Sequence, residues 1–531
     1  MKLINQYNIK RSKMLKNKII VFIVLAIMAN TVSLFSINKA SSKAMIVAAA
    51  ASSSSEKAIT KKGTDANLYG HVVNENGEHL PYATILLKGT TIGTKTDNSG
   101  HFQIINLPTG KFTVIARSIG FKPYEEEIEF VDGESVELKI TLVTSAAYAE
   151  EIVVTADRYA TERKKASLIV NTISPEKLQT TQCVVLSDGL NFSPGLRMEN
   201  NCQNCGFSQV RMNGMEGSYS QILINSRSIF SGLAGVYGLE LIPVNMIDQI
   251  EVVRGGGSAL YGSNAIAGTI NLILKDPVSN YFEAGASSGF IGLGVDGSGS
   301  PAMDNNITAN TTVVSPDKKM GIALYGYYRD REVFDANDDN YSELSMINNT
   351  TFGSRLFYRP THKSKIAIDF FNINESRNGG GSDFDLPKHE MDISEALEHK
   401  ITTGAITYTQ LLRDHDQWEV YVSGQNVNRE SYYGSNKSLQ DYGNTQGLTY
   451  SIGSTYNLDL GLSKIIGGFE ITGDDLLDTK KAYPVFNQET GEVTHTKNTT
   501  ITDQEKIIYG VFAQYEINWD KFKGTAGVKH E

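Results

Sequence analysis

The sequence predicts a mainly β protein with three folded parts: a small β-sandwich, an α+β domain and an antiparallel transmembrane β-barrel sheet. Short apolar runs alternate with Gly-, Asn- and Asp-containing turns at regular spacing between residues 67 and 143. From residue 278 onward the runs are longer and alternate strictly between apolar and polar side chains. The 48 Gly, 25 Tyr and 21 Phe, against 12 Pro, suit strands with tight turns and aromatic belts.

Length and charge exclude several classes of protein. At 531 residues the chain is too long for one ordinary domain. Its formal net charge of -10 argues against nucleic acid as a partner. Outside the extreme N-terminus, no apolar run reaches the roughly 18 residues that a membrane-spanning helix requires. A helical membrane protein is therefore not expected.

Residues 1–50 predict a cleaved secretory signal peptide followed by a small-residue linker. The charged residues before position 19 are all Lys or Arg, residues 19–29 are apolar, and small residues follow from Ala40. That order is typical of a signal peptide, and the apolar core is too short for a stable spanning helix. No cysteine follows this core directly, so a lipid-anchored start is not expected.

Residues 67–143 predict the β-sandwich. Strands are expected at 68–73, 83–87, 101–105, 111–117, 126–130 and 136–142, separated by turns whose residues tolerate positive φ. The unit resembles the carboxypeptidase regulatory-like module, which implies a periplasmic spacer. It contains no catalytic zinc pattern. His71, His79 and His101 lie on separate strands and turns and are predicted to be surface residues.

A short β-branched segment follows at residues 148–156. Its central residues are Glu151, Ile152, Val153, Val154 and Thr155. By itself such a run is an edge strand or a strand that waits for a partner. In this position it resembles the TonB box, which implies that a periplasmic energy transducer of the TonB type binds it by strand addition.

Residues 211–271 contain a long ordered motif. An apolar strand at 221–225 and a helical turn opened by Pro243 precede an alternating strand that ends at Arg254. A glycine run and a Gly-punctuated turn then lead into another apolar strand. Over about sixty residues this order resembles the plug domain of TonB-dependent outer-membrane receptors, which implies an α+β plug at residues 157–277.

The same resemblance assigns a role to two arginines of the plug. Arg211 and Arg254 match the arginines that, in related receptors, pair with glutamates on the barrel wall. A buried guanidinium group needs a carboxylate partner, because an unpaired buried charge is costly. Both side chains are therefore expected to face the lumen.

Cys202 and Cys205 form a CxxC motif within the plug. A zinc site needs two further Cys or His ligands at suitable spacing, and none lies nearby in the sequence. A redox enzyme would place the motif in a βαβ unit, which this pattern lacks. A structural disulfide in an oxidising envelope is the favoured interpretation, and binding of a soft metal such as copper is the alternative.

Residues 278–531 predict the transmembrane sheet, with one face suited to lipid and the other to a polar lumen. Short turns are expected at 315–318, 360–362, 413–416 and 518–520, and long polar loops at 331–346, 378–397, 431–445 and 472–504. Short turns on one side and long loops on the other are typical of outer-membrane barrels.

The alternating segments from Tyr281 onward number about eleven. Receptors of the resembled family close with twenty-two strands, so roughly half of a 22-stranded antiparallel barrel is predicted. An odd set of strands cannot close an antiparallel barrel, because its edges would leave backbone groups unpaired. We therefore expect an incomplete chain that forms a curved open sheet beside the plug, with edges at the Tyr281 and Thr525 strands.

Two motifs that mark enzymes in other proteins are discounted. Residues 292–297 match GxGxxG, but no helix follows, so dinucleotide binding is not expected. His389-Glu390 lacks the second histidine of a zinc-protease helix. The chain is predicted not to be an enzyme, with no cofactor and no bound metal.

The resemblance implies active import of a scarce ligand, a ferric siderophore, haem or cobalamin, across the bacterial outer membrane. The expected partners are a TonB-type transducer, outer-membrane lipid and the small ligand, with the N-terminal domain in the periplasm. Tyr432, Tyr433, His389 and His399, assigned to loops, are the candidate ligand contacts. The alternatives are a signal-transducing receptor, a glycan importer of the same superfamily, and a passive porin or adhesin, which needs neither plug nor TonB box.

Overall fold

The computed structural model describes residues 66–531 with short gaps, and these residues lie in one compact unit, Thr64–Glu531. The gaps are residues 98, 119, 145–151, 154, 156–160, 163–167, 174–177, 179–182, 184, 192, 203–206, 228–243, 256–257, 263–264, 295–298, 382–385, 414–415, 483, 487–492, 496 and 520–521.

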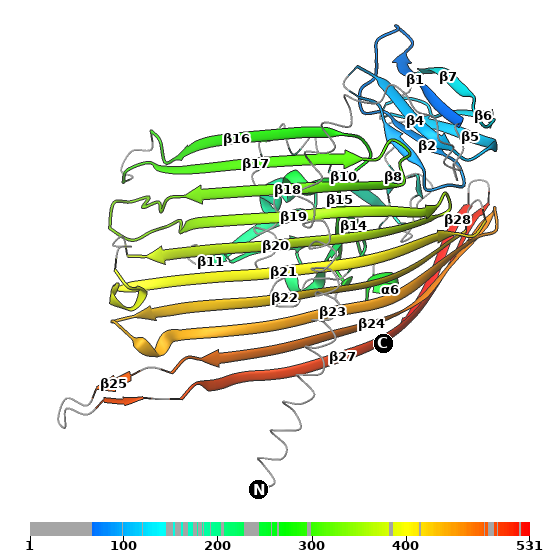
Figure 1. Ribbon diagram of the computed structural model, residues 1–531. Helices are drawn as coiled ribbons and strands as arrows, with labels where there is room; N and C mark the ends of the chain where they lie inside the picture. Colours follow the sequence, from blue (N-terminus) through cyan, green and yellow to red (C-terminus); the bar gives the residue numbers. More distant parts are fainter. Residues whose placement is uncertain are drawn as a thin grey trace, which may run out of the picture. The chain divides into compact units, whose positions relative to one another are not determined.

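The first described part is a β-sandwich with two sheets, of order β4–β1–β7 and β3–β2–β5–β6 (Figure 1). Its strands are β1 Ala66–Asn74, β2 Thr84–Leu87, β3 Gly93–Lys95, β4 His101–Leu107, β5 Gly110–Arg117, β6 Tyr124–Phe130 and β7 Ser135–Leu142. Alternate side chains such as Leu68, Ile85 and Ile140 form its buried core. The six predicted strands are confirmed. Strand β3 was not predicted, because three residues are too few to show alternation.

The second part is built around a four-stranded sheet of order β10–β14–β15–β13. Its elements are β8 Ile152–Val153, β9 Thr161–Glu162, β10 Val170–Ile173, α4 Leu186–Leu190, β11 Leu196–Cys202, β12 Phe207–Met212, η2 Gly217–Tyr219, β13 Ser220–Ile224, η3 Val244–Met246, β14 Ile247–Arg254, α6 Ser258–Tyr261 and β15 Gly268–Leu274. The helical turn after Pro243 and the strand that ends at Arg254 are confirmed. Among the described residues, no helix is long and apolar enough to cross a membrane.

Gly268 is needed where β15 begins. Its φ is +145°, and a Cβ atom there would lie 2.1 Å from the Val253 carbonyl oxygen and 2.4 Å from Met212 Sδ. Any other residue would push β15 away from β14. This glycine therefore fixes the close approach of the two central strands.

The third part is an antiparallel sheet of eleven strands, paired in chain order from β16 to β28 (Figure 1). The strands are β16 Tyr281–Ile291, β17 Ala302–Val314, β18 Met320–Arg331, β19 Met346–Thr361, β20 Ser364–Gly380, β21 Ile393–Leu411, β22 Gln417–Ser435, β23 Tyr442–Asp459, β24 Ser463–Lys480, β27 Thr499–Trp519 and β28 Phe522–His530. The predicted strand number and the predicted edge strands, β16 and β28, are confirmed.

The connections alternate between short turns and longer loops, but the predicted loop lengths were wrong. Strand β20 continues to Gly380 and β22 to Ser435, and β27 already begins at Thr499, inside the segments predicted as loops. Residues 484–486 and 493–495 form a separate hairpin, β25–β26. The ends of these strands are polar on both faces, so the sequence shows no alternation where the strands in fact continue.

The core of the plug continues into the inner face of the large sheet. One buried cluster contains Ile173, Leu190 and Met212 from the plug together with Phe371 and Leu397 from the sheet. Burial of apolar side chains from both parts stabilises their contact. The plug and the sheet therefore form one packed body.

Candidate functional site

Charged side chains link the plug to the sheet in what we call the plug–sheet charge network. It consists of Arg227 and Asp276 from the plug side and Arg355, Lys365 and Asp369 from β19 and β20. Arg355 contacts Asp369 at 2.7 Å and Asp276 at 2.5 Å, and Lys365 contacts Asp276 at 2.8 Å. Arg227 lies 3.7 Å from Asp369. Each carboxylate thus serves two cations, which compensates the cost of burying these charges.

Asp276 lies between β15 and β16, at the point where the chain leaves the plug. Burial alone would raise the pKa of its carboxyl group, but Arg355 and Lys365 more than offset this and hold the pKa below its usual value. The carboxylate is therefore ionised throughout the neutral range, and the charge network persists there.

Neutral groups extend the contact between plug and sheet. Asn245 Nδ2 donates to Asn310 Oδ1 at 2.7 Å and to the Gly326 carbonyl at 3.1 Å. The Tyr325 hydroxyl donates to the Lys275 carbonyl at 2.6 Å. These bonds join β17 and β18 to the plug, whereas the charges join it to β19 and β20.

The predicted lock residues lie elsewhere in the plug. Arg211 on β12 forms an ion pair with Glu199 on the adjacent β11, and not with a described strand of the large sheet. Arg254 is exposed and lies against Gly195. Pairing of either arginine with a glutamate of the barrel wall stays a prediction. The sequence missed Arg227 and Asp369, whose proximity follows only from the tertiary fold.

Thr155, the last of the five named residues of the predicted TonB box, is fully buried in the plug. Its N–H and hydroxyl both donate to Glu251 Oε2, at 2.7 and 2.5 Å. Its hydroxyl accepts from Asn271 Nδ2 at 3.0 Å, and its carbonyl accepts from the Tyr261 hydroxyl at 2.9 Å. We call these four residues the Thr155 anchor. The sequence predicts an edge strand or a strand without a partner here, so the burial of Thr155 is a correction.

The rest of the predicted TonB box is only partly described. Ile152 and Val153 form β8, which pairs antiparallel with β9, whereas Glu151 and Val154 lie outside the described residues. One sequence signal pointed to the anchor: Glu251 is flanked by Ile250 and Val252 within an apolar strand. A carboxylate buried there needs donors from another segment.

Two of the four candidate ligand contacts come together between β20 and β23. His389 Nδ1 lies 3.0 Å from the Tyr442 hydroxyl, and the Tyr432 ring lies 4.7 Å from the Tyr442 ring. Tyr433, the next residue on β22, is exposed on the opposite face of the strand from Tyr432. The assignment of three of the four to loops was wrong: Tyr432 and Tyr433 lie on β22, and His399 is buried within β21, 3.8 Å from Glu375. A role of these residues in ligand binding stays a prediction.

Cys202 is the last residue of β11, whereas Cys205 lies outside the described residues. The predicted disulfide therefore stays a prediction.

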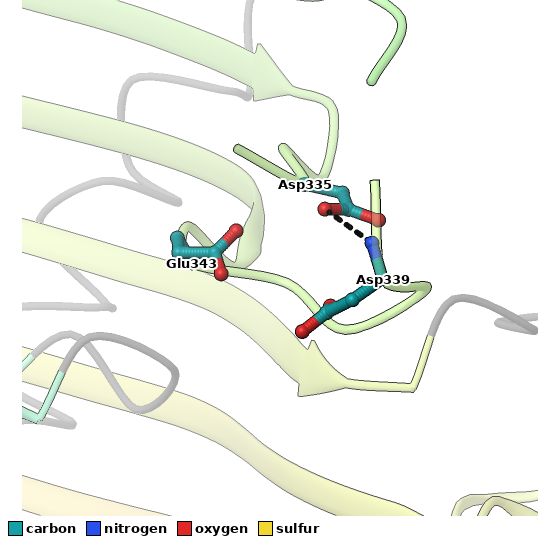
Figure 2. Close-up of side chains that lie close together, drawn as sticks. All are labelled: Asp335, Asp339 and Glu343. Carbon is teal, nitrogen blue, oxygen red and sulfur yellow. Dashed lines mark hydrogen bonds between the residues drawn. The ribbon is translucent and has the colours of Figure 1, made fainter. Parts of the chain in front are cut away.

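An acidic cluster lies in the loop between β18 and β19 (Figure 2). Oxygen atoms of Asp335, Asp339 and Glu343 lie within 4.8 Å of one another, a donor set that suits a hard cation such as Ca²⁺. The Asp335 carboxylate, however, already accepts the N–H groups of Asp338 at 2.7 Å and Asn340 at 2.8 Å. These bonds account for the cluster as an element that shapes the loop.

Comparison with known families agrees with this architecture. Residues 68–154 match the CarboxypepD_reg-like domain, and residues 162–269 match the TonB-dependent Receptor Plug Domain.

Relatives of known sequence include two vitamin B12 transporters named BtuB. The protein from Vibrio vulnificus is 34% identical over 133 residues, which are 25% of this chain and 22% of that protein. The protein from Photobacterium profundum is 27% identical over 240 residues, which are 37% of this chain and 39% of that protein. The matched region is therefore well under half of either relative.

Solved structures share the fold at low identity. The siderophore receptor PirA from Acinetobacter baumannii superposes with a TM-score of 0.54 at 17% identity, over 69% of this chain and 57% of that one. A mutant of the ferric enterobactin receptor PfeA from Pseudomonas aeruginosa gives 0.55 at 16% identity, over 71% and 59%. The chain therefore contains a plug domain of the TonB-dependent receptor kind, and its eleven-stranded sheet shares the fold of these solved receptors.

Proposed function

We propose that this chain serves TonB-dependent import of a scarce ligand, a ferric siderophore, haem or cobalamin, across the bacterial outer membrane. One observation carries the proposal: a plug is fastened to the sheet by the charge network, while the segment before it is tied to the plug core through Thr155. A passive pore needs neither feature. The chain covers only part of its relatives, so the activity of the whole protein is part of this proposal.

The geometry suggests how energy reaches the plug. A periplasmic transducer that pairs with residues 152–153 takes the place of β9, which holds them through two residue pairs. Tension then reaches Thr155, whose hydrogen bonds end on β14, α6 and β15. The plug–sheet charge network holds the plug against β19 and β20. The segment before the plug therefore yields before the contact with the sheet does.

The ligand class rests on the relatives and on the aromatic groups between β20 and β23. The relatives are named as vitamin B12 transporters and siderophore receptors, and both kinds of ligand are bulky metal chelates. His389 and Tyr442 offer imidazole, hydroxyl and ring surfaces for such a ligand, and the buried Tyr432 supports the Tyr442 ring from behind. We place the sandwich in the periplasm, before the plug.

The test is Val153→Pro in the receptor of the native strain, with Val153→Ile as the matched control. Proline lacks the N–H that strand addition uses, whereas isoleucine keeps it. Uptake of labelled cobalamin, haem and a panel of ferric siderophores is measured in energised and de-energised cells. We expect V153P to bind its ligand at the surface but to import it no faster than de-energised cells. Normal import by V153P would contradict energy coupling through this segment.

A further inference from the structure

Three histidines meet on the surface of the sandwich. The rings of His71 and His79 have centroids 5.3 Å apart, those of His71 and His101 5.6 Å, and those of His79 and His101 5.0 Å. The whole chain contains nine histidines, so a third of them lie in this one cluster. From the sequence, the three are predicted to be separate surface residues. The fold therefore creates a juxtaposition that spacing did not reveal.

The strand pairing explains how the three side chains converge. His71 on β1 lies directly opposite His101 on β4. The turn after Asn74 brings His79 back beside β1, where it bridges to Val73. Gly100 leaves the room for His79, because a Cβ atom on Gly100 would lie 2.9 Å from the His79 Cβ atom. Backbone geometry, and not chance rotation of side chains, thus holds the three residues together.

A hydrogen-bond relay sets the tautomer of His101. The Ser99 hydroxyl donates to Asp97 Oδ1 at 2.7 Å and lies 3.0 Å from His101 Nδ1. A hydroxyl has one proton, and Asp97 accepts it, so His101 Nδ1 must be the donor to Ser99. The lone pair of His101 is then on Nε2. A carboxylate relay that fixes the protonated nitrogen of a histidine is typical of metal ligands.

We propose that His71, His79 and His101 bind one divalent transition-metal ion of the Zn²⁺ class. Imidazole nitrogens suit Zn²⁺, Cu²⁺ and Ni²⁺, whereas carboxylates and carbonyls suit Ca²⁺ and Mg²⁺. Three imidazoles on one tetrahedral ion, with Zn–N distances of about 2.1 Å, have ring centroids roughly 5 Å apart. The observed separations of 5.0–5.6 Å match that spacing.

Binding needs rotation of side chains only. The rings are partly stacked, with interplanar angles of 30–53°. His79 and His101 are exposed, so side-chain rotation can direct a nitrogen of each ring to a shared ion, and on His101 this is Nε2, which the bond to Ser99 leaves available. Three protein ligands leave one position for solvent, as in open zinc sites. The ion would join β1, β4 and the turn between β1 and β2, and this inference does not depend on the transport function.

The experiment is a Zn²⁺ titration of the full chain in detergent, stripped of metal and competed against a chromophoric chelator. We expect a saturable Zn²⁺ site that His79→Ala or His101→Ala weakens at least tenfold and the double variant abolishes. Ser99→Ala should weaken it by about tenfold, because it removes the relay to His101. His530→Ala, on β28 and outside the cluster, is the matched control and should bind as the unaltered chain does.

Two readouts separate this site from others. With Co²⁺ in place of Zn²⁺, the visible absorption of a tetrahedral site should appear with the unaltered chain and vanish in the double variant. Circular dichroism checks the fold, since His79 and His101 are exposed and their replacement should leave the sandwich intact. Absence of saturable Zn²⁺ binding would overturn the proposal. So would equal binding by the folded double variant, which would place the ion elsewhere, for example at Asp335, Asp339 and Glu343.

Discussion

At the residue scale, the single side chain of Glu251 holds two parts of the plug together. It is fully buried in β14, where the neighbouring side chains are apolar. Thr155 gives one of its oxygens two donors, and Gln249 Nε2 donates to the other at 2.5 Å. Hydrogen bonds to a charged group are worth about 1.5–3 kcal/mol each. The carboxylate therefore stabilises the plug core and the segment before it together.

Replacing Glu251 by Gln should release Thr155. The amide has a single acceptor oxygen and no charge, so the two bonds from Thr155 lose the strength that an ionised acceptor gives them. We expect the Thr155 amide to exchange its proton about 10- to 100-fold faster, which corresponds to roughly 1.4–2.7 kcal/mol. Hydrogen-exchange mass spectrometry measures this rate. Glu216→Gln, on an exposed plug residue, is the control, and equal protection in E251Q and E216Q would refute the anchor.

For single residues, the sequence predicted the position within a strand or turn, but seldom the tertiary contacts of the side chain. The motif placed Arg254 at the end of its strand, and the structure agrees. It could not place Thr155 against Glu251, because that contact depends on how the chain returns over the plug. The convergence of His71 with His79 was missed for the same reason: a turn, and not a periodic pattern, brings them together.

At the scale of elements, β19 and β20 carry the charges that hold the plug. Asp369 is central, because it accepts from Arg355 and also faces Arg227. All three side chains are largely buried. Loss of one partner in a buried network leaves the other charge uncompensated, which costs about 3–5 kcal/mol.

Asp369→Asn should therefore loosen the plug from the sheet. Arg227 and Arg355 would face each other without their shared carboxylate, and we expect a loss of stability of about 3–5 kcal/mol. Limited proteolysis of the folded protein should cut the plug earlier than in the unaltered chain. Asp503→Asn, at an exposed site on β27, is the control. Partial rescue by Arg227→Met in the D369N background is also expected, because it removes the unpaired cation.

The plug–sheet charge network should also determine the pH below which the contact between plug and sheet loses stability. The pKa of Asp276 is below its usual value in the folded protein, because Arg355 and Lys365 outweigh the effect of burial. A lowered pKa gives stability that is complete above the unfolded pKa of about 3.9 and is lost as pH falls below it. We expect equal resistance to proteolysis from pH 5 to 8, measured with proteases active across that range. A marked decline within that range would contradict this assignment.

The sequence predicted these elements unevenly. Strict alternation predicted eleven strands in the large sheet, because each strand has one apolar and one polar face. The same rule failed at the strand ends, where both faces are polar and residues such as those of β27 from Thr499 onward read as loop. Strand β3 has only three residues, which are too few to show an alternating pattern in the sequence.

At the scale of the whole molecule, three parts follow one another and differ in how they are held. The sandwich has its own apolar core. The plug shares its core with the inner face of the large sheet. The sheet holds itself by continuous antiparallel pairing from β16 to β28. Removing the plug should therefore disturb the sheet, whereas removing the sandwich should leave plug and sheet intact.

The pairing of β1 with β7 has a mechanical consequence. The first and last strands of the sandwich run parallel through eight residue pairs, from Asn67↔Ser135 to Asn74↔Leu142. Force applied through the two ends of the domain loads all these pairs at once, in shear. The β8–β9 contact has two antiparallel residue pairs, and force on the outer ends of these strands breaks the pairs one after the other.

We expect the sandwich to survive loads that strip β8 from β9. Optical-tweezers handles before β1 and after β7 load the sandwich, and handles before β8 and after β9 load that pair; rupture of the sandwich should need clearly more force than the opening of β8–β9. Handles at Thr109 and Asp132, which peel apart the β5–β6 hairpin, are the control and should unfold the sandwich at lower force. Equal rupture forces in the two directions would contradict this. A domain whose first and last strands are paired in this way resists tension along the chain. The tension is then transmitted through the folded sandwich to the segment that follows it.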